Sequence, residues 1–478
     1  MRLQILGHAG LRVNAGGREL LCDPWILGSC YWRSWWNYPP VPETIRASLS
    51  PDYIYLTHLH WDHFHGPSLR CFPKTTRFFV PYFRYDRMCR DLRNLGFHNI
   101  TEIKHGRRVR LASDFAIRSY HFGPLFTDSA LVIEADNTVI FNANDAKLAG
   151  LPLKQILSDY PQIDFCLRSH SSANARRCMH VEDEPTAPSD DDTHYVSSFS
   201  LFMSRVNPRF AIPFASNSCY LHKDVVGMNA FSQTPLLVKR YFESFAKSKD
   251  LGAELKIMVP GDEWTSDGGF RLSEHDYFEE RDVHLRQYSK RVQPILDKYY
   301  KKEDSRVSLD LIRRFFSELW QRTPYLLKRR LSNERIVIVS VSTNARDYFA
   351  VNLQSGTVSH MAADQLKSDD VRAEFPAAVL SQSIRMNMFT QAWISKRVHY
   401  YTTRSRMFIL KGVLRILELN EAELLPLHRA VTFRTFKALL PRWREAFLYL
   451  HVLWHLVRRR SFLEIEARLL EVRARALE

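Results

Sequence analysis

The sequence predicts an α+β fold in which two β-sheets pack face to face between outer helices, an αββα sandwich, followed by a C-terminal α+β region that is largely helical. Short apolar runs typical of strands alternate with segments of helical apolar spacing over the first half of the chain. Such interleaving favours two sheets with outer helices over a simple doubly wound parallel sheet. A dense group of metal-ligand side chains directly follows one of these runs, and sites are often built at strand ends.

Strands are predicted where β-branched and aromatic residues form short runs bounded by turn residues. The predicted strands are residues 3–6, 11–13, 19–22, 53–57, 77–80, 115–120, 130–134, 138–141, 165–167 and 211–213. Helical apolar spacing predicts helices at residues 85–95 and 235–247.

Two domains are expected, because 478 residues exceed the usual size of a single domain. The turn-rich stretch at 266–269 places the boundary near residue 270, so that the catalytic domain is 1–270 and the C-terminal domain 271–478. The second domain is predicted to hold a charged helix at 279–301 and paired strands at 335–341 and 348–353. It ends in a basic amphipathic helix at 436–477. We expect this helix to pack on a partner helix or on the core rather than on a membrane.

Charge and cysteine content narrow the class of partner and compartment. A net charge of +15 favours anionic partners such as phosphorylated or acidic small molecules, whereas no nucleic-acid recognition motif accompanies it. Seven unpatterned cysteines fit a reducing compartment better than a disulfide framework. The N-terminus does not read as a signal peptide, and no window approaches the ~20 apolar residues of a spanning helix. The expected location is cytoplasmic, and a homo-oligomer remains open.

The strongest motif is the run His58-Leu59-His60-Trp61-Asp62-His63, which directly follows the predicted strand 53–57. Neutral imidazoles and carboxylates are the ligands of borderline and harder divalent metals. Three histidines and one aspartate within six residues do not match a helical face. At a strand end they can fan outward and reach two metal sites.

Further ligands are expected at the ends of later strands. His121 follows the strand 115–120, Asp145 follows the strand 138–141, and His222 follows the strand 211–213 after a short loop. Each alone reads more simply as a structural polar residue. Together with the run they predict a dinuclear site in which a carboxylate could bridge two metals.

This ligand pattern resembles that of the metallo-β-lactamase superfamily. The resemblance implies a metallo-β-lactamase-type αββα sandwich in which His58, His60 and His121 hold one metal. Asp62, His63 and His222 would hold the second, with Asp145 bridging. Asp23-Pro24-Trp25, Trp35-Trp36 and the stretch 207–215 also look like the catalytic domain of CMP-N-acetylneuraminic acid hydroxylases. Those enzymes carry a Rieske iron–sulfur domain first, whereas this chain starts directly with the metallo-β-lactamase part. Either electrons arrive from a separate donor protein, or the chemistry is not oxygenation by that route.

Two reactions suit the predicted ligands. In the first, iron activates dioxygen and the enzyme is a hydroxylase of an anionic metabolite such as a nucleotide-sugar. In the second, two zinc or manganese ions support hydrolysis of an ester, lactone or phosphodiester. Asp62 and Asp145 are the candidate catalytic residues, since either carboxylate could orient a nucleophile and accept its proton. Iron and the hydroxylase are favoured by resemblance alone.

Four residues are candidates for binding an anionic substrate. Arg33, Arg168 and Lys223 carry the positive charge that pairs with phosphate or carboxylate, although for each one alone a solvated surface position is the favoured interpretation. His170 follows the strand 165–167 and could face the same pocket. His8 is expected to lie under the metal site as a supporting group.

Overall fold

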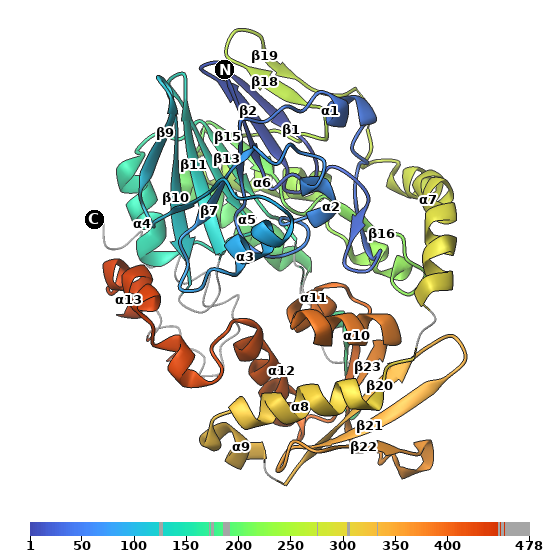
Figure 1. Cartoon of the computed structure of the whole chain (residues 1–478). Coiled ribbons are helices and arrows are strands. Elements are labelled where there is room, and N and C mark those ends of the chain that lie inside the picture. Colours follow the sequence, from blue (N-terminus) through green and yellow to red (C-terminus); the bar gives the residue numbers. More distant parts are fainter. Residues whose placement is uncertain are drawn as a thin grey trace.

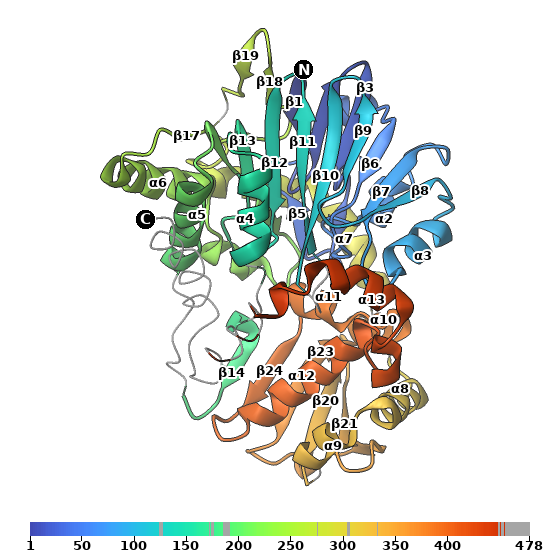
Figure 2. The ribbon, with the colours of Figure 1, turned by 90° about the vertical axis from the view of Figure 1, so that its left-hand side faces the viewer.

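The computed structural model describes residues 1–123, 128–171, 173, 176–184, 192–274, 276–303, 306–331, 333–447, 450 and 454. Residues up to about 271 form a sandwich of two sheets with helices on both outer faces. A second part, with its own sheet, lies below this sandwich in both ribbon views (Figures 1 and 2).

The first sheet of the sandwich brings several strand ends to one edge. Its strand order is β19-β18-β1-β2-β3-β6-β7-β8. The strands are β1 (Arg2–Ile5), β2 (Leu11–Ala15), β3 (Arg18–Cys22), β6 (Tyr53–Tyr55), β7 (Arg77–Pro81), β8 (Ile100–Ile103), β18 (Glu263–Thr265) and β19 (Gly269–Arg271). Because β3, β6, β7 and β8 are parallel neighbours, the loops that follow β3 and β6 leave the sheet side by side.

The second sheet has the order β17-β15-β13-β12-β11-β10-β9. Its strands are β9 (Arg108–Ala112), β10 (Phe115–Phe122), β11 (Asp128–Ala135), β12 (Thr138–Asn144), β13 (Phe165–Arg168), β15 (Phe210–Pro213) and β17 (Glu254–Leu255). The strands β9 to β12 are antiparallel, whereas β12, β13, β15 and β17 are parallel.

Three apolar layers hold the sandwich together. Residues such as Leu11, Phe115 and Ile133 fill the space between the sheets. Helices α1 (Glu43–Ala47), α2 (Gly66–Leu69) and α3 (Arg87–Asn94) pack on the outer face of the first sheet. Helices α4 (Gly150–Asp159), α5 (Asp192–Val206) and α6 (Pro235–Lys249) pack on the outer face of the second. Burial of these apolar faces is the main stabilising contribution to the fold.

The C-terminal part contains a six-stranded sheet of order β14-β24-β23-β20-β21-β22. Its strands are β20 (Arg335–Val341), β21 (Arg346–Asn352), β22 (Val358–Met361), β23 (Val371–Pro376) and β24 (His399–Thr402), with β14 (Met179–Val181) contributed by the N-terminal half. The helices are α7 (Arg281–Glu303), α8 (Leu309–Arg322), α9 (Tyr325–Leu331), α10 (Ala377–Met386), α11 (Phe389–Ile394), α12 (Met407–Glu421) and α13 (Phe433–Leu439).

A small sheet connects the two parts. It consists of β4 (Ser29–Cys30), β5 (Trp35–Asn37) and β16 (Ser218–Tyr220). The aromatic side chains between β4 and β5 are buried in the same apolar cluster as the core of the C-terminal part. Trp35 Nε1 donates to the Ile394 carbonyl at 3.1 Å, and Ser34 Oγ donates to the Ser395 carbonyl at 2.6 Å. These contacts fix the C-terminal helices against the sandwich.

Most predicted elements are confirmed within one to three residues. The strand predicted at 335–341 is β20, and the helices predicted at 85–95, 235–247 and 279–301 are α3, α6 and α7. The predicted terminal helix at 436–477 lies largely outside the described residues. In its described part the large apolar side chains from Phe436 to Trp454 are exposed, so the expectation that they pack on the core is wrong there. No helix among the described residues has the length and apolar character needed to cross a membrane.

The ion pair between the half-buried Arg335 and the buried Asp370 makes the stability of the C-terminal sheet depend on pH. Arg335 donates to both carboxylate oxygens of Asp370, at 2.8 and 2.6 Å. Burial raises the pKa of Asp370, but the hydrogen bond from Arg335 and the Lys367 backbone outweigh it and lower the pKa below its usual value.

We therefore expect Asp370→Asn to lower the free energy of unfolding by about 1–3 kcal/mol at pH 7. The pKa of Asp370 is lowered on folding, so its stabilising contribution is complete above about pH 4 and disappears as the pH falls through the lowered pKa. Urea unfolding at pH 7 and pH 3 measures both values. An equal loss at the two pH values would contradict the role given to the Asp370 charge.

Candidate metal centre

The run from His58 to His63 forms a tight turn directly after β6. The backbone amides of His63 and Phe64 donate to the His60 carbonyl at 3.0 and 2.7 Å, which folds the run back on itself. His58, Asp62 and His63 are all buried. The turn therefore gathers these side chains in one place, whereas an extended strand would have sent alternate side chains to opposite faces.

A first cluster of potential ligands consists of His58, His60 and Asp145. His58 Nε2 lies 2.8 Å from His60 Nδ1 and 3.7 Å from Asp145 Oδ2. Asp145 follows β12, so this cluster joins the edges of both sheets. Burial and a neighbouring imidazole lower the pKa of both histidines. Both rings are consequently neutral at pH 7, which is the state that binds a metal.

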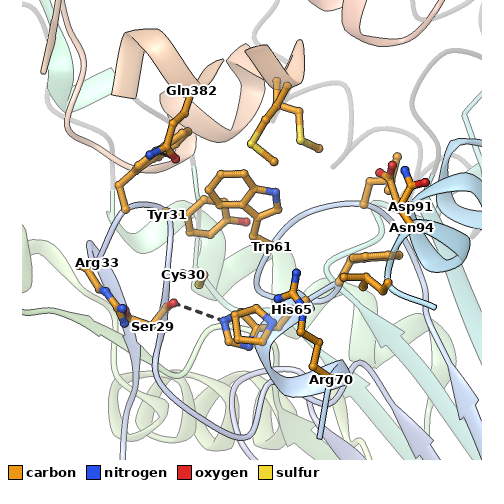
Figure 3. Close-up of a pocket in the computed structure, with 18 of the residues that line it drawn as sticks. Ser29, Cys30, Tyr31, Arg33, Trp61, His65, Arg70, Asp91, Asn94 and Gln382 are labelled. Atoms are coloured by element: carbon orange, nitrogen blue, oxygen red, sulfur yellow. Dashed lines mark hydrogen bonds between the residues drawn. The ribbon is translucent and has the colours of Figure 1, made fainter. Parts of the chain in front are cut away.

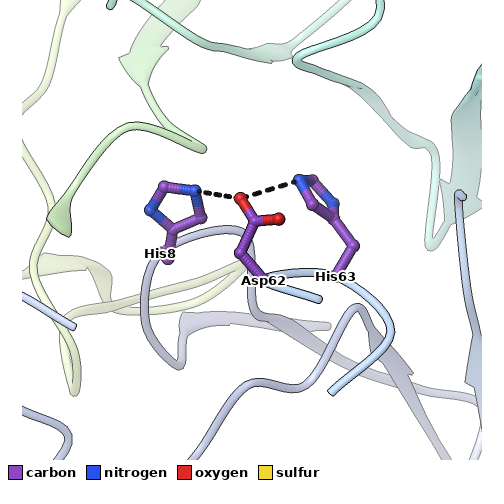
Figure 4. Close-up of side chains that lie close together, drawn as sticks. All are labelled: His8, Asp62 and His63. Carbon is purple, nitrogen blue, oxygen red and sulfur yellow. Dashed lines mark ion pairs between the residues drawn. The ribbon is translucent and has the colours of Figure 1, made fainter. Parts of the chain in front are cut away.

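A second cluster consists of His8, Asp62 and His63 (Figure 4). His8 Nε2 lies 3.0 Å from Asp62 Oδ2, and His63 Nε2 lies 3.7 Å from the same oxygen. Asp145 approaches this cluster as well, with Oδ1 3.6 Å from His63 Nε2. Since its other oxygen points to His58, Asp145 lies between the two clusters and is placed to bridge them.

The charged groups of the second cluster shift one another's pKa values. Burial lowers the pKa of His63, but Asp145, Asp62 and Asp23 together outweigh it and raise the pKa to about 10. Burial raises the pKa of Asp62, and the neighbouring His63 and His8 more than reverse this, so the carboxyl is ionised well below its usual range. The raised pKa means that His63 carries a proton in the metal-free chain at pH 7, and a metal ion bound beside the carboxylates of Asp62 and Asp145 would displace that proton.

Asp23 fixes the orientation of the His63 ring. It follows β3 and is fully buried. Its Oδ2 lies 2.8 Å from His63 Nδ1 and accepts from Thr57 Oγ1 at 2.6 Å, while its Oδ1 accepts from the Thr57 amide at 2.8 Å. A carboxylate on Nδ1 leaves Nε2 of the same ring facing the cluster, which is the usual arrangement behind a metal-binding histidine.

We expect Asp23→Asn to weaken metal binding at the second cluster by about 10–100-fold, because His63 would lose the carboxylate that orients it. Titration of the metal-free protein with zinc, followed by calorimetry, measures this. Asp52→Asn is the matched control. Asp52 stands just before β6, where it pairs with Arg18, away from the clusters. Equal zinc affinity in Asp23→Asn and the unmodified chain would contradict this role.

Asp128 is a site residue that sequence reasoning missed. It lines the same small cavity as His58 and His60. Burial and the neighbouring Asp145 raise its pKa to about 6. The sequence pattern predicts ligands at the carboxyl ends of strands, whereas Asp128 stands at the amino end of β11. Because β10 and β11 are antiparallel, that end lies at the same edge as the carboxyl end of β10.

His121 and His222 lie outside both clusters, contrary to the roles expected from the resemblance. The His121 ring packs against Phe83 and His105, with ring centroids 5.2 and 5.5 Å apart. His222 Nε2 lies 3.3 Å from Glu303 Oε2. Glu303 is the last residue of α7, a helix of the C-terminal part.

The four expected substrate residues are spread over different places. Arg33 lines the larger cavity described below. Lys223 lies in a separate cavity, with Nζ 4.8 Å from the ring centre of Tyr300. Arg168 is buried with its guanidinium 3.8 Å from the ring centre of Phe202, so it is not available to a substrate in this structure.

His170 is fully buried, and neither of its ring nitrogens has a hydrogen-bond partner of normal geometry among the described residues. Burial and the neighbouring His8 lower its pKa to about 3. His170 is therefore a neutral imidazole close to the second cluster, not a group that binds an anion.

Two cavities adjoin the centre. The smaller, of about 180 Å³, is lined by His58, His60 and Asp128 from the sandwich and by residues of α11 and α12 from the C-terminal part. The larger, of about 540 Å³, lies beside the aromatic residues of the loop between β4 and β5 (Figure 3). Both cavities share Leu59, Arg87 and Met388 in their walls. The helices α11 and α12 therefore cover the candidate metal ligands.

The residues present fit a pair of metal ions. His63 Nε2 and Asp145 Oδ1 are buried, lie 3.6 Å apart and have no hydrogen-bond partner among the described residues. Buried polar atoms are normally paired, and donor atoms left unpaired beside one another are what a bound cation would satisfy. The imidazole and carboxylate donors suit iron, zinc or manganese. The two clusters are consistent with a dinuclear centre.

Comparison with known proteins gives similarity over part of the chain. No family model matches the sequence. Rieske 2Fe-2S iron–sulfur proteins of Mycobacterium tuberculosis are 27% identical over 250 residues, which is 49% of this chain and 47% of the relative. The corresponding protein of Mycolicibacterium smegmatis is 33% identical over 183 residues, 36% of this chain and 35% of the relative. The chain thus spans about half the length of the curated relatives it matches, or less.

The cytidine monophosphate-N-acetylneuraminic acid hydroxylase of Danio rerio is 32% identical over 69 residues, 14% of this chain and 12% of the relative. Among solved structures, a metallo hydrolase from Ignicoccus hospitalis covers 55% of this chain and 96% of its own, with 17% identity and a TM-score of 0.38. The diiron β-hydroxylase CmlA from Streptomyces venezuelae covers 54% of this chain and 52% of its own, with 16% identity and a TM-score of 0.36.

These findings and the described geometry agree on the general type of protein. The expected resemblance to CMP-N-acetylneuraminic acid hydroxylases is confirmed over part of the chain, and similarity to Rieske iron–sulfur proteins, which was not expected, also covers part of it. The two-sheet sandwich carries its histidine and aspartate ligands at the strand edge, as expected. The described part of the chain is an αββα sandwich that carries two groups of candidate metal ligands at its strand edge.

Proposed function

We propose that this chain is a dinuclear, iron-dependent oxygenase of the hydroxylase type that acts on an anionic small molecule. The observation that carries the proposal is the ligand set. Asp62, Asp145 and Asp128 stand among histidine side chains, and hard carboxylate oxygens beside imidazoles suit iron with open positions. The names of the relatives, Rieske iron–sulfur proteins and a hydroxylase, support oxidative chemistry.

When bound, the iron pair would supply the activation of dioxygen. Electrons would come from a separate donor protein. The chain's own residues would position the ions and exclude water. Asp145 reaches both clusters, His58 and His60 hold one side, and the helices α11 and α12 cover the approach. Asp62 is tied to Tyr31 and His8, which hold its carboxylate in one orientation.

The larger cavity offers a place for an anionic substrate. Arg33 and Arg70 both line it (Figure 3), and no ion pair joins either of them to a carboxylate among the described residues. Arg33 donates to Ser29 Oγ at 3.1 Å. Trp61 forms the opposite wall, stacked on Tyr31 with ring centroids 5.9 Å apart. An anion with a flat or apolar part would pair with the guanidinium groups and lie against the rings.

We expect Arg33→Ala and Arg70→Ala each to weaken binding of such an anion by about tenfold or more. Adenosine monophosphate is a suitable probe, because it combines a phosphate with an aromatic ring. Isothermal titration calorimetry gives its dissociation constant. Arg313→Ala is the matched control, since Arg313 pairs with Asp310 on the exposed face of α8. Unchanged affinity in a variant that combines Arg33→Ala and Arg70→Ala would show that this cavity does not bind the anion.

Hydrolysis is the second candidate function. The ligands seen here contain imidazole and carboxylate groups and no thiolate, and this donor set serves zinc and manganese as readily as iron. With those metals Asp62 or Asp145 would orient the attacking nucleophile and take up its proton.

Elemental analysis of protein produced without added metal distinguishes the two functions. The hydroxylase proposal predicts two iron atoms per chain and oxygen uptake in the presence of a chemical reductant. His60→Ala should lose metal, whereas the exposed His98→Ala should not. Two zinc or manganese atoms, with anaerobic cleavage of bis-p-nitrophenyl phosphate, would overturn the hydroxylase proposal in favour of the hydrolase.

A further inference from the structure

The described end of the chain carries a row of large apolar side chains that face solvent. We call it the apolar stripe, and its members are 47–73% exposed. It consists of Phe433, Phe436, Leu440, Trp443, Phe447, Leu450 and Trp454. Consecutive members are three or four residues apart. Soluble proteins seldom expose so many large apolar groups together unless they bind a partner or a membrane.

Helical backbone places the first members of the stripe on one face. Phe433–Leu439 is the helix α13, and a 3₁₀ turn follows from Leu440 to Arg442. Leu440 and Trp443 also have right-handed helical dihedral angles. In such a backbone, residues three or four positions apart are neighbours on the same side.

The opposite face of this segment is polar and packs against the protein. Arg434 Nε donates to the Phe83 carbonyl at 2.9 Å, and its guanidinium pairs with Glu102 on β8. Arg442 and Glu445 are both buried and form an ion pair. A surface helix usually turns its apolar side toward the core and its charges toward water. Here the arrangement is reversed, so packing within the described protein does not account for the stripe.

The charges around the stripe are almost all positive. In the sequence from 427 to 454 the basic residues are Arg429, Arg434, Lys437, Arg442 and Arg444, and Glu445 is the sole acidic residue. Lys437 Nζ lies 4.4 Å from the ring centre of Phe433, and the Arg444 guanidinium lies 5.7 Å from that of Trp443. Exposed cations therefore border the aromatic rings.

We propose that the apolar stripe binds the surface of an anionic lipid bilayer and lies in the plane of its headgroups. Aromatic rings flanked by lysine and arginine are typical of interfacial segments, and the excess of basic residues complements anionic headgroups. The stripe would thus attach the chain to the surface of the bilayer without crossing it.

A helical protein partner fits the stripe less well. Pro441 stands in its middle and interrupts the continuous helix that a coiled coil requires. Five of the seven members are aromatic, whereas coiled-coil seams use leucine, isoleucine and valine. The bilayer surface places no such demand on the packing of the rings.

Vesicle sedimentation of the full chain tests the proposal. With phosphatidylcholine vesicles that contain about 30% phosphatidylserine, the native chain should sediment, and its partition coefficient should be at least about tenfold lower for phosphatidylcholine alone. Phe436→Glu combined with Trp443→Glu should lower it about tenfold or more. Tyr325→Glu combined with Leu326→Glu is the matched control, because both side chains are highly exposed on α9, away from the stripe.

Four results would overturn the proposal. The native chain could fail to sediment with anionic vesicles, or the stripe variant could sediment as well as the control variant. Binding by a chain that ends at residue 454, but not by the full chain, would show that residues 455–478 cover the stripe. Loss of an oligomer in the stripe variant, without vesicle binding by the native chain, would assign the stripe to a second copy.

Discussion

Replacement of His63 by alanine is expected to reduce the bound metal from two equivalents to one or fewer and to lower turnover by about three orders of magnitude. His63 Nε2 faces both Asp62 and Asp145 and has no hydrogen-bond partner among the described residues. A metal ion contributes several kcal/mol of transition-state stabilisation, and its loss removes that contribution from the rate. Plasma mass spectrometry gives the metal content, and oxygen uptake gives the turnover.

The matched control is His98→Ala, which removes an exposed imidazole on the same half of the sandwich. Circular dichroism of both variants should match that of the native chain, since His63 lies at a strand edge and not within an apolar layer. A His63→Ala protein that keeps two metal ions and native turnover would show that the second cluster does not bind metal.

Replacement of Arg397 by methionine is expected to lower the free energy of unfolding by about 3–5 kcal/mol. Arg397 is buried where the two parts of the chain meet. Its Nη2 lies 2.8 Å from Asp224 Oδ2 and 3.0 Å from Glu303 Oε2, and its Nη1 donates to the Trp32 carbonyl at 3.1 Å. Removal of the cation leaves two carboxylates without their main partner, and that penalty is larger than the energy of the ion pair itself.

The urea midpoint of unfolding, followed by tryptophan fluorescence, measures this effect. Arg385→Met is the control, because Arg385 lies exposed on α10, where its Nε donates to Ser381 Oγ at 3.4 Å. Arg397→Met combined with Glu303→Gln should lose less than the sum of the two single variants, since the two residues share one interaction. Strict additivity would contradict the coupling drawn here.

The local part of the site could be predicted from the sequence. His58, His60, Asp62 and His63 occupy one short turn after a strand, so their proximity follows from chain connectivity alone. Asp145 was also identified correctly as a neighbour of this run, because it directly follows a strand in the opposite sheet. The strands themselves were found because their apolar and turn residues follow a clear local pattern.

The remaining contacts depend on tertiary packing and were harder to foresee. Asp128 joins the site through an antiparallel pairing that a search of strand carboxyl ends overlooks. His222 was expected beside the run, but its Nε2 lies 3.3 Å from Glu303 Oε2 of α7. The helices α11 and α12 roof the metal ligands from more than 300 residues away in the sequence, and no local pattern encodes such a contact.

The central claim is that two groups of side chains from the edges of two sheets hold two metal ions. Anomalous X-ray diffraction from crystals of the metal-loaded chain tests it most directly. We predict two peaks, one about 2.0–2.2 Å from donor atoms of His58, His60 and Asp145, and one at the same distance from donor atoms of Asp62 and His63. Strong peaks bound only at other side chains, with both clusters empty, would contradict the claim.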